Sequence, residues 1–151
     1  MDAIVALTQK IQRLERQIHK LQTTGFQKPI WLAAPLTSAS WNGDSFSTTA
    51  KTLIDLSAVF SAPAGIKAIV ALLHIRDSAS ASGGGDYKIV LSPNNTADSG
   101  PAARCGGLVN DLWHSEVLTV PCDANGDVYY QIAASGANTF EVYLEIWAYW
   151  L

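Results

Sequence analysis

A short segment near residue 113 gathers side chains that bind ligands or exchange protons, namely Asp111, Trp113, His114 and Glu116. An imidazole beside carboxylates can move protons, but an acid–base pair also needs a defined geometry that sequence spacing does not supply. An indole beside carboxylates offers a flat apolar surface with hydrogen-bond acceptors at its rim, which is how proteins usually hold sugars. The segment therefore indicates binding rather than catalysis, with Trp113, His114 and Asp111 as candidate ligand-binding residues.

A second group of oxygen-bearing side chains lies at residues 123–127, in the run Asp-Ala-Asn-Gly-Asp. Oxygen ligands at alternate positions and a turn-forming glycine also begin a calcium-binding loop. The twelfth position, where such a loop needs a bidentate glutamate, is Ala134. A hairpin turn between two strands explains the same residues better. Two cysteines and three scattered histidines fit no zinc spacing, so we predict neither a metal nor another cofactor.

The remaining polar motifs lack the partners that catalysis requires. The glycine-rich run Ser80–Gly85 has neither the lysine nor the following helix of a phosphate-binding loop, and it reads as a flexible connection. His74 stands in an apolar strand, where a histidine with a hydrogen-bond partner is the usual role. No Ser-His-Asp set and no pair of carboxylates stands out. We therefore predict that the chain is not an enzyme.

Composition limits the classes of protein to which the chain can belong. With 151 residues, 48% of them hydrophobic and 15% charged, it can form one ordinary domain and a small appendage. The net charge of -3 gives no broad attraction for nucleic acid, and no apolar run is long enough for membrane insertion. Met1–Leu7 is too short for a signal peptide. Cys105 and Cys122 can pair or stay reduced, and reduced thiols are slightly favoured.

Beyond Pro29 the hydrophobic pattern has the period of two that is typical of strands. Turn formers rich in serine, glycine, asparagine and aspartate separate the apolar runs, and no helix is expected among them. The chain is therefore predicted to be mainly β, with an antiparallel β-sandwich or jelly roll. The candidate strands are Ile30–Ala34, Thr49–Ser57, Ile66–Arg76, Tyr87–Ser92, Ala102–Val109, Glu116–Val120, Val128–Ala133 and Thr139–Trp150.

The last candidate strand, Thr139–Trp150, has one apolar face and one aromatic, acidic face. The second face carries two carboxylates and three large aromatic rings, an unusual set for a surface that meets only water: Glu141, Tyr143, Glu145, Trp147 and Tyr149. Either the protein's own loops cover these rings or neighbouring subunits do. We expect neighbouring subunits to cover them, with Trp147 or Tyr149 at the interface.

The first 25 residues have a different period. Apolar residues recur at intervals of three and four, with isoleucine at every a position and leucine at every d position of a heptad repeat. No third apolar residue widens the stripe, as it would in a helix packed on its own domain. We predict a parallel coiled coil over residues 1–25 and a β-sandwich head over residues 26–151. The heptad residues are Ile4, Leu7, Ile11, Leu14, Ile18 and Leu21.

The number of chains in this coiled coil follows from less direct signals. β-branched residues at a with leucine at d favour two chains. The run from Lys10 to Glu15 instead resembles a short trimerisation motif, in which a basic g residue pairs with a glutamate e residue of the next helix. Lys10 stands where that motif usually has arginine, which loses a bidentate contact. With the aromatic face of Thr139–Trp150, the pairing of Lys10 with Glu15 favours a homotrimer held mostly by its heads.

A short N-terminal coiled coil followed by a β head resembles the layout of trimeric phage tail-fibre and receptor-binding proteins. Heads of the tumour-necrosis-factor and complement-C1q type are similar in plan. The resemblance implies a non-enzymatic adhesion protein on a virion or an extracellular surface, with a cell-surface glycan or receptor as its partner. Polar loops at residues 77–86 and 93–107 are further candidates for recognition. A secreted C1q-like or lectin-like module and a purely structural assembly protein are the alternatives.

Overall fold

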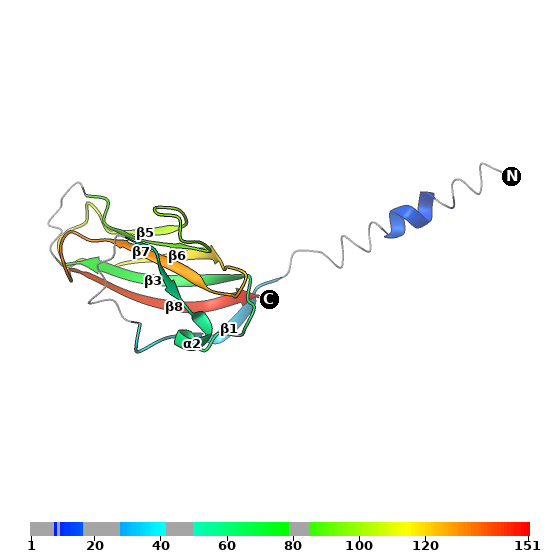
Figure 1. Ribbon diagram of the computed structural model, residues 1–151, viewed down its shortest axis with the longest axis horizontal. Helices are drawn as coiled ribbons and strands as arrows, with labels where there is room; N and C mark the ends of the chain where they lie inside the picture. The colour runs from blue at the N-terminus through cyan, green and yellow to red at the C-terminus, as the bar shows by residue number, and fades with distance from the viewer. Residues whose placement is uncertain (1–7, 9, 17–27, 42–49, 79–84) are drawn as a thin grey trace.

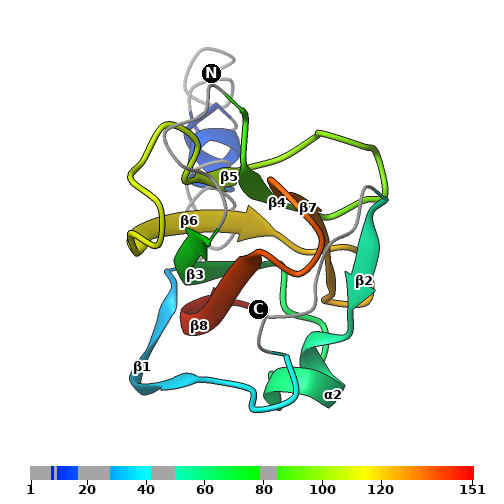
Figure 2. The ribbon, with the colours of Figure 1, turned by 90° about the vertical axis from the view of Figure 1, so that its left-hand side faces the viewer.

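The chain folds into two antiparallel four-stranded sheets that lie face to face (Figures 1 and 2). The computed structural model describes residues 8, 10–16, 28–41, 50–78 and 85–151. The first sheet has the strand order β1-β8-β3-β6, and the second has the order β2-β7-β4-β5. The prediction of a mainly β chain with an antiparallel sandwich is therefore confirmed.

The strands pair in a nested order along the chain. β1 pairs with β8, β2 with β7, β3 with β6 and β4 with β5, and β8 and β7 also join β3 and β4. The elements are β1 (Ile30–Leu36), β2 (Thr52–Ile54), α2 (Leu56–Phe60), β3 (Ala68–Asp77), β4 (Lys88–Ser92), β5 (Ala102–Arg104), β6 (His114–Pro121), β7 (Val128–Ala133) and β8 (Phe140–Trp150).

The core lies between the sheets and is built by alternation. On β3 and β8 every second side chain points inward, and residues such as Leu73, Ile75 and Phe140 are completely or almost completely buried. Each such side chain contributes about 1.5–3 kcal/mol by leaving water. Because the two strands pair directly, their inward rows form one continuous apolar layer. Their outward rows form an equally continuous surface, which carries the candidate site.

The segment predicted as the strand Thr49–Ser57 is divided between a short strand and a helix. β2 ends at Ile54, and α2 begins after Asp55, whose carboxylate accepts a hydrogen bond of 2.9 Å from the backbone N–H of Ala58. Leu56 and Phe60 are both buried, at the spacing of one helical turn. The expectation of no helix is therefore wrong, because an N-cap residue and this pair outweigh the strand pattern. α2 lies at the edge of the sandwich near β1 and β2 (Figure 2).

β5 is shorter than predicted and β6 is longer. The backbone N–H groups of Cys105 and Gly106 both donate to the carbonyl of Tyr87, which ends the regular ladder at Arg104. A turn then follows, in which the N–H of Leu108 donates to the carbonyl of Cys105. β6 begins at His114, two residues before the predicted start.

The turn at residues 123–127 connects the two sheets rather than two paired strands. β6 belongs to the first sheet and β7 to the second, so the predicted hairpin is wrong although the turn itself is present. The carboxylate of Asp123 accepts hydrogen bonds from the backbone N–H groups of Asn125, at 2.8 Å, and Asp127, at 2.9 Å. Both bonds use Oδ1 of Asp123, an oxygen atom that a calcium loop would direct at its ion.

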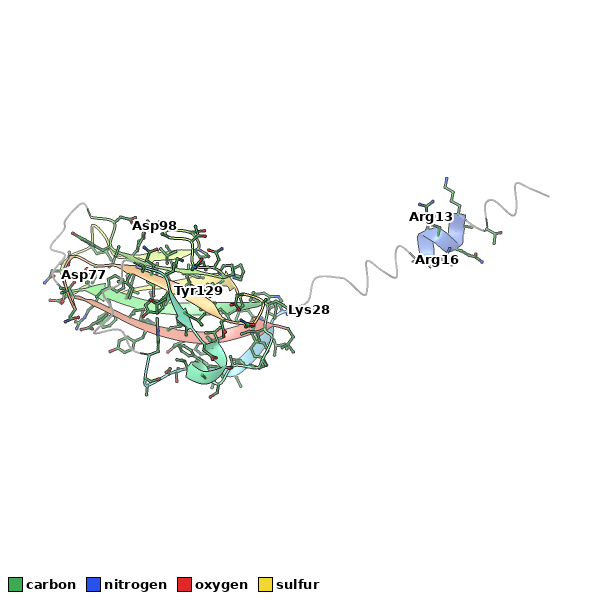
Figure 3. The ribbon with its side chains drawn as sticks, viewed as in Figure 1. Arg13, Arg16, Lys28, Asp77, Asp98 and Tyr129 are labelled. Carbon is green, nitrogen blue, oxygen red and sulfur yellow. The ribbon has the colours of Figure 1, made fainter. Side chains whose placement is uncertain are left out.

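The two ends of the sandwich are distinct, and Figure 3 labels a residue at each. Lys28 lies at the end where β1 begins and β8 finishes, since Ile30 pairs with Tyr149. Asp77 lies at the opposite end, where β3 finishes opposite Phe140. Asp77 is buried, and its carboxylate accepts hydrogen bonds from the backbone N–H and the hydroxyl of Ser135. These bonds fasten the β7–β8 connection to the Asp77 end.

The N-terminal segment is helical where the structure describes it. Thr8 and residues 10–16 have helical backbone, and Ile11 and Leu14 are 47% and 49% exposed. Lys10 and Glu15 both lie within the helical residues 10–16. The other heptad residues and the boundary between residues 25 and 26 lie outside the described residues. The coiled coil therefore stays a prediction. Among the described helices, none is both long and apolar enough to cross a membrane.

Gly100 and Gly65 differ in how closely other backbone atoms approach them. Gly100 has φ of +126°, and a Cβ there would lie 2.0 Å from the carbonyl oxygen of Leu91. Gly65 has φ of +74° with open space around its Cβ position. We expect Gly65→Ala to cost about 1 kcal/mol, the strain of a left-handed residue. Gly100→Ala should cost roughly 1–3 kcal/mol more, because a backbone atom must also move.

Urea unfolding at a fixed protomer concentration measures both costs. Equal unfolding midpoints for the two variants would contradict the close approach of residues 91 and 100.

Candidate functional site

The outward surface of the β1-β8-β3-β6 sheet carries the exposed aromatic residues Trp31, Trp113 and Tyr143 together with charged side chains. Along β3, Val70, Leu72, His74 and Arg76 point away from the core in sequence from the Lys28 end to the Asp77 end. The nearest outward residues on β6 and β8 are set by register. Leu72 faces Val117 and Glu145, His74 faces Ser115 and Tyr143, and Arg76 faces Glu141. The surface is thus apolar at one end and ionic at the other.

An apolar groove occupies the half nearer the Lys28 end. It has a volume of about 350 Å³, and Trp31, Val70, Leu72, Val117 and Trp147 line it. We call these five residues the apolar groove. Trp31 and Val117 are 66% and 64% exposed, which is high for large apolar side chains. A surface of this kind is unfavourable in water unless another surface covers it.

An irregularity in the pairing of β3 with β8 interrupts the alternation of β8 at Trp147. Val70 faces Ala148 and Ala71 faces Ile146, so Trp147 has no direct partner on β3. Trp147 faces outward like Glu145, lines the groove, and donates a 2.8 Å hydrogen bond from Nε1 to Glu145. Beyond this β-bulge Tyr149 faces Ile69 and packs partly buried against the core, so its predicted place on the same face as Trp147 is wrong. The two aromatic residues predicted for an interface therefore lie in different surroundings.

An aromatic and ionic group occupies the half nearer the Asp77 end, and we call it the Trp113 cluster. It consists of Arg76, Asp111, Trp113, Glu141 and Tyr143. The guanidinium carbon of Arg76 lies 4.9 Å from the centre of the Trp113 ring. The centres of the Trp113 and Tyr143 rings lie 5.5 Å apart, with an angle of 34° between the ring planes. Both contacts favour a fixed indole, the first through the attraction between a cation and an aromatic face.

Glu141 holds Arg76 in place beneath the indole. Arg76 donates two hydrogen bonds to it, from Nε to Oε2 at 2.7 Å and from Nη2 to Oε1 at 2.5 Å. Asp111 lies at 4.0 Å from the Nη1 atom of the same guanidinium. Hydrogen bonding to Glu141 raises the pKa of Arg76 above its ordinary value, so the side chain is a cation at all physiological pH values. The cluster combines one cation with two carboxylates.

His114 lies apart from the two residues with which the sequence groups it. It shares the β6 face of Glu116 and Leu118, whereas the Trp113 cluster continues the face of Ser115 and Val117. Its Nε2 atom lies 3.7 Å from a Glu116 carboxylate oxygen. The structure thus brings Trp113 and Asp111 together with Arg76, and it places His114 in a separate pair with Glu116.

Arg76, Glu141 and Tyr143 are absent from the candidates chosen by sequence. Arg76 is 65 residues from Glu141 and 67 residues from Tyr143 along the chain. Only the register of β3 with β8 makes Arg76 face Glu141 and His74 face Tyr143. The strand alternation marks each of them as an outward residue, but it does not say which strands are neighbours. His74 itself makes a 2.7 Å hydrogen bond with Ser115, which is the structural role expected for it.

The loop at residues 93–101 is fastened to the second sheet. Lys51 donates hydrogen bonds of 2.6 Å to the Ser92 hydroxyl and 2.8 Å to the Ser99 carbonyl, and burial lowers its pKa below the ordinary value. Asp98 lies 3.3 Å from the ammonium group of Lys88, and its N–H donates to Gln131. This predicted recognition loop therefore packs on β4 and β7. In the part of the chain that the structure describes, no three acidic, histidine or cysteine side chains are grouped to hold a metal ion.

The chain matches no protein-family model and no curated protein. Its function must therefore be inferred from the geometry of its own surfaces.

Both cysteines are free thiols in the structure. Burial is the main cause that raises the pKa of Cys105 to about 11 and that of Cys122 to about 12. Nearby carboxylates add to both shifts, Asp77 for Cys105 and Asp123 with Asp127 for Cys122. Since the thiolate is the reactive form, both should be poor nucleophiles at neutral pH.

We expect iodoacetamide at pH 8 to alkylate both cysteines in the folded protein at least about a hundred times more slowly than in urea-unfolded protein. Mass spectrometry of peptides measures each site separately. A native thiol that reacts at the unfolded rate would show that its surroundings are more open than described.

Proposed function

We propose that this chain is the subunit of a homotrimeric, non-enzymatic receptor-binding head, similar in plan to the tip of a phage tail fibre, that recognises cell-surface carbohydrate. One observation carries the proposal. The Trp113 cluster, with its exposed indole, lies at the Asp77 end of the sandwich, opposite the end where the N-terminal segment enters at Lys28. A stalk at one end of the head would present that cluster outward to a surface.

The nested strand order supports a jelly-roll plan. β1 pairs with β8, β2 with β7, β3 with β6 and β4 with β5, in two four-stranded sheets. Double-sheet jelly rolls have this arrangement of eight strands. Heads of the tumour-necrosis-factor and C1q type use this plan in trimers, and phage fibre tips use similar ones. A fold of this kind hosts many functions, so the assignment of adhesion rests on the surface and not on the fold.

Two exposed apolar surfaces support self-association. In the helical segment, Ile11 and Leu14 stand at heptad positions and are about half exposed in the single chain. In the head, the apolar groove exposes Trp31 and Val117 and includes Trp147, one of the residues expected at an interface. Three copies around one axis would cover both surfaces at once. The pairing of Lys10 with Glu15 of a neighbouring helix would set the register.

The proposed mechanism is multivalent. Three sites held at fixed spacing raise the effective concentration of each site for a second and third receptor, so weak individual contacts add up to firm attachment. We place the protein on a virion or an extracellular surface accordingly. A secreted C1q-like module would be favoured by a bond between Cys105 and Cys122, but both are free thiols here.

The molar mass in solution tests the trimer. Light scattering should give three times the 16.2 kDa mass of the chain. Val117→Glu, which places a charge in the apolar groove, should lower the apparent mass toward that of one chain at micromolar concentration, because burying an unpaired charge costs several kcal/mol. Leu53→Glu is the matched control, because Leu53 is 47% exposed on β2 of the other sheet and should not affect assembly.

A chain truncated to begin at Phe26 should still form trimers at a higher concentration, because the heads supply most of the contact. A full-length protein that is monomeric at all concentrations would disprove the assembly on which the mechanism depends.

Binding to cells and to a glycan array tests adhesion. The full-length trimer should bind a subset of glycans, and it should attach to cells that display them more firmly than a dissociated Val117→Glu protein does. Silence on the array together with no attachment to a broad panel of bacterial and animal cells would contradict adhesion and favour a purely structural role.

A further inference from the structure

We infer that the Trp113 cluster is a stacking platform for a single uncharged hexose unit and that it disfavours acidic sugars. This inference rests on the proposed adhesion function and names the class of ligand that its site would take. The relevant side chains are those of Arg76, Asp111, Trp113, Glu141 and Tyr143.

The indole of Trp113 is held by two neighbours and stays accessible. Arg76 and Tyr143 both project from the outward surface of the β3–β8 pair and contact the ring. The residue is nevertheless 42% exposed. The accessible part of the indole is a flat apolar surface at the Asp77 end of the head, suited to stacking against one pyranose ring.

The platform is rigid before any ligand arrives. Arg76 cannot move freely beneath the indole, because two hydrogen bonds to Glu141 fix its guanidinium plane. The backbone that leads into Trp113 is also constrained, since Asp111 has φ of +60° and the N–H of Leu112 donates to the carbonyl of Val109. A ligand that stacks on this ring therefore freezes little side-chain motion, which lowers the entropic cost of binding.

The rim of the platform offers hydrogen-bond acceptors to hydroxyl groups. The carboxylate of Asp111 is 52% exposed and lies beside Arg76, within the same cluster as the indole. An ionised carboxylate accepts hydrogen bonds and donates none, which complements the many hydroxyl donors of a sugar. An apolar face for the C–H side of a pyranose and acceptors at its edge together fit a hexose better than a peptide or a lipid chain.

The charges of the cluster select against acidic sugars. Arg76 is its single cation, and Glu141 and Asp111 both lie within ion-pair distance of it. Glu141 occupies the Nε and Nη2 edge of the guanidinium, so an incoming sugar carboxylate would have to approach Nη1, where Asp111 already lies at 4.0 Å, and it would stand near two negative charges. An uncharged hexose can stack on Trp113 without disturbing this arrangement.

An array of matched glycan pairs, identical except for a terminal sialic acid, tests the inference on the full-length protein. The uncharged member of each pair should bind more strongly. Trp113→Ala should weaken that binding by about tenfold, the scale of one aromatic stacking contact, and Trp113→Phe should weaken it less. Val109→Ala is the matched control, because the exposed Val109 side chain lies outside the cluster and the substitution keeps the backbone carbonyl that accepts from Leu112.

The double variant Asp111→Asn with Glu141→Gln leaves the shapes of the side chains and removes both negative charges. It should raise binding of the sialylated glycans relative to the uncharged ones by about tenfold, as expected when an arginine is freed for a carboxylate. A wild-type preference for sialylated glycans, or normal glycan binding by a folded Trp113→Ala protein, would overturn the platform but leave adhesion standing. Attachment to cells without any glycan binding would do the same, whereas the absence of both would overturn the proposed function as well.

Discussion

The antiparallel pairing of β3 with β8 is the constraint on which the rest of this structure depends. These are the two longest strands in the part of the chain that the structure describes, and they pair over almost their whole length at the centre of the first sheet. Their register aligns the inward rows that form the core and, by the same alternation, the outward rows that form the surface. A shift of β8 by one residue would exchange the two faces of that strand. It would expose Phe140 to water and bury Glu141 on the core side, so the burial energy that fixes the core also fixes the outward surface.

The same pairing divides the outward surface into an apolar half and an ionic half. Near the Lys28 end, Val70 and Leu72 of β3 lie beside Val117 and the bulged Trp147, and the result is wholly apolar. Toward the Asp77 end, the same strands bring Arg76 opposite Glu141, and the ion pair supports Trp113 from below. A surface suited to contact with another protein chain and a surface suited to a polar ligand thus lie at opposite ends of one sheet. The proposed stalked, multivalent binding head requires that separation, because assembly and recognition must not compete for the same side chains.

Much of the local structure could be predicted from the sequence. The strand Val128–Ala133 has the predicted bounds, and Ile30, Thr139 and Trp150 mark strand ends to within one residue, because alternating apolar residues between turn formers specify a strand locally. The failures also have local causes. Asp55 caps a helix where the apolar run indicated a continuous strand, and two N–H groups that share the carbonyl of Tyr87 end β5 early. Capping and bifurcated bonds depend on single side chains or on distant backbone, which periodicity does not register.

The sequence by itself determined the mainly β class, the alternation that sorts core from surface, and the exposure of Trp113 and Asp111 in one connecting segment. It also determined the heptad pattern whose residues Ile11 and Leu14 are exposed on a helical turn. Only the tertiary structure decided which strands are neighbours. The strand order and register bring Arg76 together with Glu141 and Tyr143 at Trp113. They also place His114 on the other face of β6 and make the turn at residues 123–127 a connection between the two sheets. The physical reason is that strand order and register follow from burying all apolar rows at once, a condition that involves the whole chain and no single segment.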